Sequence, residues 1–292
     1  MTIQIPSGFN FRTTVNSHGW YDLPPFRSND TMTLLQTVIS LTPKKHVTIT
    51  IRETGSVLTI TNDRTIRLTR TEQERIKNIV RSMLRMDEQF SKFYSLCKKE
   101  PHLRWVLKRG AGRILRSPTV FEDVVKMMFT TNCSWALTKI QTVQLTTKLG
   151  KRTVENFFSF PPPETIARQT EHWLRRELSC GYRAPYLLKL CNDLTNNTIE
   201  LESMRHSDLP TEELYWKLRS IKGIGHYAAG NILKLLGRYD YLGIDSWVRT
   251  RFSEIHTKGR KVSDAHIEKH YDRYGSWRGL VCLMEVTSDW HG

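Results

Sequence analysis

Residues 211–247 read TEELYWKLRSIKGIGHYAAGNILKLLGRYDYLGIDSW and carry the clearest structural pattern of the chain. Apolar residues recur at helical spacing on both sides of a short turn, Leu214, Leu218 and Ile221 before it and Ala228, Ile232, Leu235 and Leu236 after it. The turn itself is Gly223-Ile224-Gly225. The pattern predicts a helix-hairpin-helix over about residues 211–237.

The glycines of this turn suggest what it binds. Glycine lets backbone N–H groups approach a phosphate closely, here at the positive N-terminus of the second helix, so Gly223, Gly225 and His226 are candidates to grip a nucleic-acid backbone without reading bases. A purely structural turn is the alternative. A dinucleotide site is rejected because the turn follows a helix and because Gly230 lies five residues beyond Gly225, where three are required.

Asp245 follows the second helix, eighteen residues after Tyr227, with Leu242, Ile244 and Trp247 beside it. A carboxylate among apolar residues is unusual unless it caps a helix or takes part in chemistry. Both interpretations can hold at once, because Asp245 stands directly before the helical pattern SWVRTRF.

The spacing of apolar residues differs between the N-terminal part of the chain and the remainder. The first ~70 residues are β-prone, and HVTITIRETGSVLTITN (residues 46–62) predicts a hairpin around Glu53, Thr54 and Gly55. Helical patterns dominate from Thr71, with further helices expected to begin near Ser117-Pro118, Pro163, Ala184, Thr211 and His226. We expect a mainly α protein with a β-rich N-terminal α+β domain at residues 1–110 and an all-helical domain at residues 111–292. LKRGAGRILRSP (107–118) would join them, and the prolines of 157–169 mark a loop.

Composition and charge narrow the partner. The 292 residues are 39% hydrophobic and 25% charged, which is typical of a globular protein, and the net charge of +15 favours a polyanionic partner. Residues 101–152 hold ten Lys or Arg against Glu122 and Asp123, which predicts a basic patch carrying +8. A solvated basic face without a partner is the alternative.

Several classes are not expected. No run of ~18 apolar residues occurs, and MTIQIPSGFN lacks a basic region followed by an apolar run, so we expect neither a membrane span nor a secretory signal. The five cysteines are scattered without a C-x-x-C pair and are interpreted as reduced thiols, not as a disulfide framework or a zinc or iron–sulfur site. HIEKH (266–270) differs from H-E-x-x-H because Glu268 is displaced by one position, so its histidines are expected on a solvated helix and no catalytic metal is expected.

Together these motifs resemble the helix-hairpin-helix DNA glycosylases. Residues 221–245, IKGIGHYAAGNILKLLGRYDYLGID, match that family's L-P-G-[IV]-G…D pattern, with Lys222 in place of the usual Pro. GYRA (181–184) resembles the segment by which 8-oxoguanine glycosylases contact the opposite strand, and residues 116–140 resemble the family's helix and gap-filling loop, which includes Trp135. The resemblance covers most of the chain and implies the helix-hairpin-helix glycosylase fold, as in the 3-methyladenine glycosylase II and 8-oxoguanine branches.

The resemblance also implies roles for single residues. Asp245 would stabilise the oxocarbenium-like transition state and orient water. Tyr227 stands where bifunctional members carry a lysine, which implies a monofunctional enzyme with Tyr227 lining the pocket for a damaged base. Trp277 would join that pocket, although core packing is the default for both Trp277 and Trp290. The residues expected to contact DNA around a flipped base are Tyr182, Arg183, Asn132, Cys133 and Ser134. Backbone carbonyls of Arg219, Ile221 and Ile224 would hold a Na⁺ or K⁺ ion, and no other cofactor is expected.

The sequence therefore predicts a base excision repair DNA glycosylase of the 3-methyladenine glycosylase II type, which hydrolyses the N-glycosidic bond of alkylated purines. Its partner would be double-stranded DNA with damaged bases, without a membrane, and the protein would be a monomer, cytoplasmic and nucleoid-associated in a prokaryote or nuclear in a eukaryote. One alternative is an 8-oxoguanine-type glycosylase with lyase activity, favoured by GYRA and opposed by Tyr227. The other is a non-catalytic helix-hairpin-helix DNA-binding module, opposed by Asp245.

Overall fold

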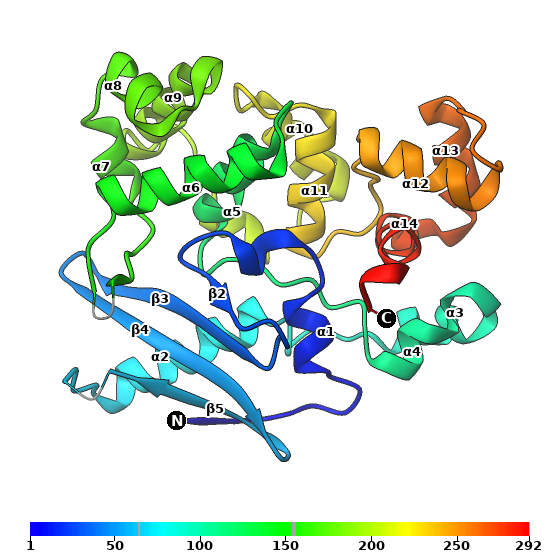
Figure 1. The fold of residues 1–292 in the computed structure, drawn as a ribbon, viewed down its shortest axis with the longest axis horizontal. Helices are drawn as coiled ribbons and strands as arrows, with labels where there is room; N and C mark the ends of the chain where they lie inside the picture. Colours follow the sequence, from blue (N-terminus) through cyan, green and yellow to red (C-terminus); the bar gives the residue numbers. More distant parts are fainter. Residues whose placement is uncertain (64, 154–155, 292) are drawn as a thin grey trace. The chain divides into compact units, whose positions relative to one another are not determined.

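The structure, a computed structural model, describes residues 1–63, 65–153 and 156–291 (Figure 1). The chain forms two compact units, the first made of residues 1–88 and 113–203 and the second of residues 89–112 and 204–292. These units differ from the predicted domains, residues 1–110 and 111–292, because each unit is made of two separate segments. In the described part, no helix is long and apolar enough to span a membrane.

A five-stranded antiparallel sheet opens the first unit, in the order β1-β5-β4-β3-β2. The strands are β1 (Thr2–Gln4), β2 (Arg27–Ser28), β3 (Leu34–Thr42), β4 (Lys45–Thr54) and β5 (Val57–Asn62). Alternate residues of β4, Val47, Ile49 and Ile51, are fully buried, as expected of a strand with one face against a core. The predicted hairpin is confirmed: Thr54 pairs with Val57, and Gly55 takes the left-handed φ of 63° that the turn requires.

Helix α2 (Arg70–Met83) is tied to the sheet by polar contacts. It begins with a capping box between Thr69 and Glu72, and the same Glu72 forms an ion pair of 2.6 Å with Lys45 of β4. Its core-facing residues include Ile76, which is fully buried. The helical pattern that starts at Thr71 breaks after α2, where Arg85 has a φ of 54°, although neither Gly nor Pro marks the break.

The first unit also contains several helices outside the sheet. They are α1 (Phe11–Val15), α5 (Val120–Thr130), α6 (Trp135–Leu149), α7 (Pro163–Ala167), α8 (Glu171–Leu178) and α9 (Ala184–Thr195). Helix α5 begins near Ser117-Pro118 as predicted, but its N-cap is Thr119 instead of Ser117, whose N–H donates to Asp123 Oδ1 at 2.9 Å. The prolines of the 157–169 segment lead into α7, which begins at Pro163 as predicted.

The second unit is helical. Its longer elements are α3 (Ser91–Lys99), α4 (Arg104–Arg109), α10 (Thr211–Ser220), α11 (His226–Leu236), α12 (Ser246–His256), α13 (Asp264–Tyr271) and α14 (Arg278–Val286). Short 3-10 helices lie at η2 (Pro101–Leu103), η6 (Asp272–Trp277) and η7 (Ser288–His291). The predicted helix-hairpin-helix is confirmed as α10 and α11, which follow one another around the 221–225 turn (Figure 1).

Candidate active site and nucleic-acid interface

The hairpin turn is shaped by its first glycine. Gly223 has a φ of 94°, a conformation that costs a residue with a side chain about 1 kcal/mol or more, and the Ile224 N–H donates to Ile221 O at 3.0 Å to close the turn. Ile221 and Ile224 are buried. The turn is therefore a rigid connection between two packed helices.

Gly225, the second glycine, is the N-cap of α11, so no side chain caps this helix end. A Cβ built on Gly225 would meet only Arg219 Nη1 at 3.8 Å, an ordinary contact, so packing within the protein does not require glycine there. An uncovered backbone at a helix N-terminus is what a phosphate needs in order to approach. Beside it, His226 Nδ1 lies 2.7 Å from the Tyr215 hydroxyl, which orients the exposed imidazole.

The expected cation site does not fit this turn. The Arg219 guanidinium donates to the Ile224 carbonyl at 3.1 Å. A Na⁺ or K⁺ ion on that same carbonyl would lie next to a permanent positive charge and be repelled by it. The carbonyl of Ile221 already accepts the Ile224 N–H. In this arrangement the positive charge beside the turn comes from the protein itself, through Arg219.

Asp245 is the N-cap of α12, as the sequence predicted. Its Oδ1 accepts the Val248 N–H at 2.8 Å, and the residue is half-buried beside the buried Leu242 and Ile244. The carboxylate therefore has a fixed orientation, and the N-terminus of α12 favours its negative charge.

Three glycines hold the loop that presents Asp245. A Cβ on Gly230 of α11 would lie 2.6 Å from Leu242 O, and one on Gly243 would lie 2.3 Å from the Asn231 amide. A Cβ on Gly279 would meet Tyr241 O, and its N–H donates to Tyr239 O at 2.6 Å. At Gly230 and Gly279 the loop lies against backbone carbonyls, so it can come this close to α11 and α14 only because these two residues lack side chains.

Helix α11 holds a buried amine that the sequence pattern did not predict. Lys234 is only 6% exposed, and its burial lowers the pKa of the amine to about 8, against the opposing influence of Cys282 and Asp245. The signal was a lysine inside the apolar run NILKLL, seven residues after Tyr227 and hence on the same face of α11. Tyr227 itself is half-buried, in the first turn of the helix.

Trp277 packs among aromatic rings. It stacks on Tyr239 with ring centroids 5.3 Å apart and an interplanar angle of 17°, and it lies 5.2 Å from the Phe93 ring. These contacts are those of core packing, the default interpretation for this residue. Trp290 is 45% exposed and lies 5.1 Å from the Trp247 ring.

The residues expected around a flipped base come together in the first unit. Asn132 has a φ of 45° in the turn between α5 and α6, and Ser134 caps α6 by accepting the Leu137 N–H. Cys133 is half-buried between them. Tyr182, 45% exposed in η4 (Gly181–Arg183), has its hydroxyl 3.4 Å from Asn132 Nδ2. An exposed aromatic ring thus stands over a short, sharply bent loop.

Arg183 supports this loop from inside. It is 4% exposed, its guanidinium donates to the carbonyls of Thr131 and Asn132, and its charge lies 4.6 Å from the Tyr182 ring centroid. Neighbouring Trp135 is held by Asp22 and lies over Gly19, where a Cβ would fall 2.4 Å from the ring. Arg183 is therefore placed to position the loop, and Tyr182 is placed to contact a ligand.

The basic patch predicted for residues 101–152 is wrong as a continuous surface. Arg113, Arg116 and Lys126 are buried, and Lys126 is paired with Glu122 at 2.6 Å. Two of the exposed cations, Lys139 and Lys148, are paired with acidic residues. The segment also belongs partly to each compact unit. The number of Lys and Arg residues in the segment overstates its surface charge, because some of these side chains are buried.

Comparisons with known proteins identify the fold. No family model and no curated protein matches the chain in sequence. Among solved structures, 3-methyladenine DNA glycosylase from Archaeoglobus fulgidus superimposes with a TM-score of 0.79 at 18% identity, over 100% of this chain and 99% of that one. An 8-oxoguanine glycosylase/lyase from Clostridium acetobutylicum gives 0.77 at 17% identity, over 98% and 95%. The 3-methyladenine DNA glycosylase of Schizosaccharomyces pombe gives 0.54 at 19% identity, over 66% of this chain and 94% of that one. The chain has the fold of the helix-hairpin-helix DNA glycosylases.

Proposed function

We propose that this protein is a base excision repair DNA glycosylase that hydrolyses the N-glycosidic bond of damaged purines. The observation that carries the proposal is the placement of Asp245, fixed by its hydrogen bond to Val248 at the N-terminus of α12, shortly after the hairpin. The similarity of the fold to those of solved DNA glycosylases supports the proposal.

The chemistry follows from the fixed carboxylate. Breaking the N-glycosidic bond develops positive charge on the deoxyribose, and a carboxylate that is oriented before the reaction stabilises this charge without reorganising. Because the residue is half-buried, the interaction is screened less than that of a fully exposed carboxylate. The same carboxylate can orient the attacking water on the sugar.

The hairpin supplies affinity for DNA without sequence preference. A phosphate would bind the backbone N–H groups at the start of α11, next to Gly225, with the Arg219 guanidinium contributing positive charge nearby. Because these contacts reach only the backbone, they suit an enzyme that must search all sequences for damage.

Base flipping would use the other group of residues. Extruding a nucleotide costs a few kcal/mol, which a residue that fills the gap in the stack can offset. Tyr182 offers an exposed aromatic ring for that purpose, and Arg183 and the Asn132 loop hold it in place.

We further propose that the enzyme is monofunctional and prefers alkylated purines. The solved 3-methyladenine and 8-oxoguanine glycosylases superimpose almost equally well, so the choice depends on single residues. By the family resemblance, Tyr227 would stand where a lysine is needed to form a Schiff base with the sugar. Its aromatic ring suits a cationic alkylated base, because such a ring attracts positive charge.

The proposal is tested by incubating the full chain with duplexes that carry 7-methylguanine, 3-methyladenine, hypoxanthine or 8-oxoguanine, and by scoring abasic sites after alkaline cleavage. We expect excision of alkylated bases and intact abasic products. Excision of 8-oxoguanine alone, with strand cleavage that needs no alkali, would favour the oxidised-purine lyase instead. DNA binding without excision of any base would favour the non-catalytic module. Sedimentation of the protein on the same duplexes tests whether it acts as a monomer.

A further inference from the structure

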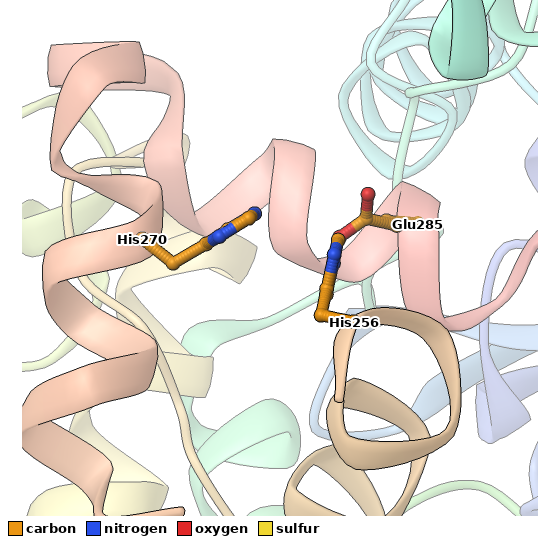
Figure 2. A group of neighbouring side chains, drawn as sticks. All are labelled: His256, His270 and Glu285. Atoms are coloured by element: carbon orange, nitrogen blue, oxygen red, sulfur yellow. The ribbon is translucent and has the colours of Figure 1, made fainter. Parts of the chain in front are cut away.

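Three side chains suited to a metal ion meet in the second unit. His256 is the last residue of α12, His270 lies near the end of α13, and Glu285 lies in α14. One donor atom from each falls within 4.8 Å of the others. Figure 2 shows the His270 ring extending from its helix toward the His256 and Glu285 side chains.

Glu285 is a buried carboxylate that needs compensating charge. Its side chain is only 8% exposed. Its Oε2 lies 2.8 Å from His256 Nε2 and also accepts the Tyr271 hydroxyl, and its Oε1 lies 3.3 Å from His102 Nε2. A buried carboxylate is costly unless it is paired with a positive charge or coordinates a metal, and the Tyr271 phenol supplies neither.

His270 has an unused donor atom at the same place. Its Nε2 is buried without a hydrogen-bond partner among the described residues, and its ring centroid lies 4.2 Å from that of His256. Leaving a buried polar atom unsatisfied costs about 1–3 kcal/mol, so such an atom in a native structure requires an explanation. An ion bound between His270 and Glu285 would satisfy the His270 nitrogen and the Glu285 charge together.

We propose that His256, His270 and Glu285 bind a divalent transition-metal ion of the zinc class. Two imidazole nitrogens and a carboxylate oxygen are a zinc ligand set, which becomes four-coordinate with a water or with the nearby His102 Nε2. Binding displaces the proton shared between His256 and Glu285, which is released to solvent. Donor atoms about 2.0–2.2 Å from the ion lie closer together than 4.8 Å, so small side-chain rotations complete the site.

Neighbouring groups are placed to orient the ligands. The Tyr271 hydroxyl donates to Glu285, and Glu100 Oε2 lies 3.8 Å from His102 Nδ1, the ring nitrogen that faces away from Glu285. Such outer contacts fix ligand orientation in metal sites. Three different helices contribute the ligands, which is why the H-I-E-K-H motif on α13 alone gave no hint of the site; the expectation of solvated histidines is wrong for half-buried His270.

The role of the ion would be structural. It would join the C-terminal end of α12 to α13 and α14, and α12 is the helix that begins at Asp245. This inference does not depend on the proposed glycosylase activity, because it concerns only how the helix is held.

The test uses the full chain after treatment with a chelator, titrated with zinc chloride by calorimetry and melted with and without zinc. We expect one zinc ion per chain, a higher melting temperature with zinc, and visible absorption bands when cobalt(II) replaces it. His270→Ala should weaken zinc binding by about tenfold or more. His266→Ala is the matched control, because His266 lies on the same helix and is exposed, and its zinc affinity should not change.

His270→Ala is expected to fold without zinc, because the Nε2 that it removes has no hydrogen-bond partner among the described residues. His256→Gln is a second variant, with an amide that can still donate to Glu285. Absence of stoichiometric zinc binding would overturn the proposal and leave a proton-bridged His–Glu pair. Equal zinc affinity in His270→Ala and the unmodified protein would also overturn it, since the ion would then lie elsewhere.

Discussion

Asp245→Asn separates two roles that one carboxylate combines. Asparagine is as good an N-cap as aspartate, so the hydrogen bond to Val248 can be kept while the charge is lost. The variant loses the favourable interaction between its charge and the helix N-terminus, about 0.3–1 kcal/mol of unfolding free energy, together with the attraction of that charge to the buried Lys234 amine. The loss of transition-state stabilisation should be larger, about 2.7 kcal/mol or more, which corresponds to an excision rate at least ~10²-fold lower.

These magnitudes exclude unfolding as the cause of lost activity. A domain with an unfolding free energy of about 5 kcal/mol or more that loses 1 kcal/mol is still more than ~99% folded at 25 °C. Asp245→Ser provides a matched control, because serine is also a good N-cap and has neither charge nor amide. Asp245→Ala should cost about 1 kcal/mol of stability through the lost cap.

The assay is single-turnover excision from a duplex containing 7-methylguanine, with DNA binding followed by fluorescence anisotropy and stability by urea denaturation. We expect Asn and Ser variants that bind DNA, unfold near the midpoint of the unmodified protein and excise slowly. An Asp245→Asn protein that excises within tenfold of the unmodified rate would refute the electrostatic role. A slow variant with a much lower urea midpoint would show instead that the cap, and not the charge, is decisive.

Four further predictions follow from the same structure. Tyr182→Ala should reduce excision from duplex far more than from single strands, because the ring acts on the distorted duplex; equal losses would indicate another role. Borohydride should trap no protein–DNA adduct, and an adduct abolished by Lys222→Ala would show that the amine lies before the turn. The depressed pKa of Lys234 means that the unfolded state binds more protons between pH ~8 and ~10.5, so stability should rise with pH there by roughly 3 kcal/mol, and urea melts of Lys234→Met should lack this rise. Because Arg219 occupies the Ile224 carbonyl, affinity for DNA should be equal in potassium and choline chloride of the same ionic strength, whereas a specific requirement for potassium would contradict the arrangement.

Local patterns in the sequence predicted the elements that depend on local contacts. The hairpin helices are visible because Leu214 and Leu218, like Ala228 and Ile232, recur at the spacing of a helix face, and all four are fully buried. The β4–β5 hairpin and the cap at Asp245 are likewise short-range features, set by residues within a few positions of one another.

Features that depend on distant residues were missed. The N-terminus of α5 is set at Thr119, with Glu202 accepting the N–H groups of Val120 and Phe121 from more than eighty residues away. Charge counting could not reveal that Lys126 is buried against Glu122. The His256–His270–Glu285 cluster is assembled from three helices, and only tertiary structure brings them together.

The order of segments in the two compact units has a consequence for synthesis on the ribosome. Residues 1–88 cannot complete their unit until residues 113–203 have been made, and residues 89–112 must wait for residues 204–292. Phe93 of α3 therefore lacks its later partner Trp277 while more than ninety further residues are translated. A fragment that ends at residue 110 would contain neither unit whole. A truncated protein should therefore end at residue 203, where the first unit is complete.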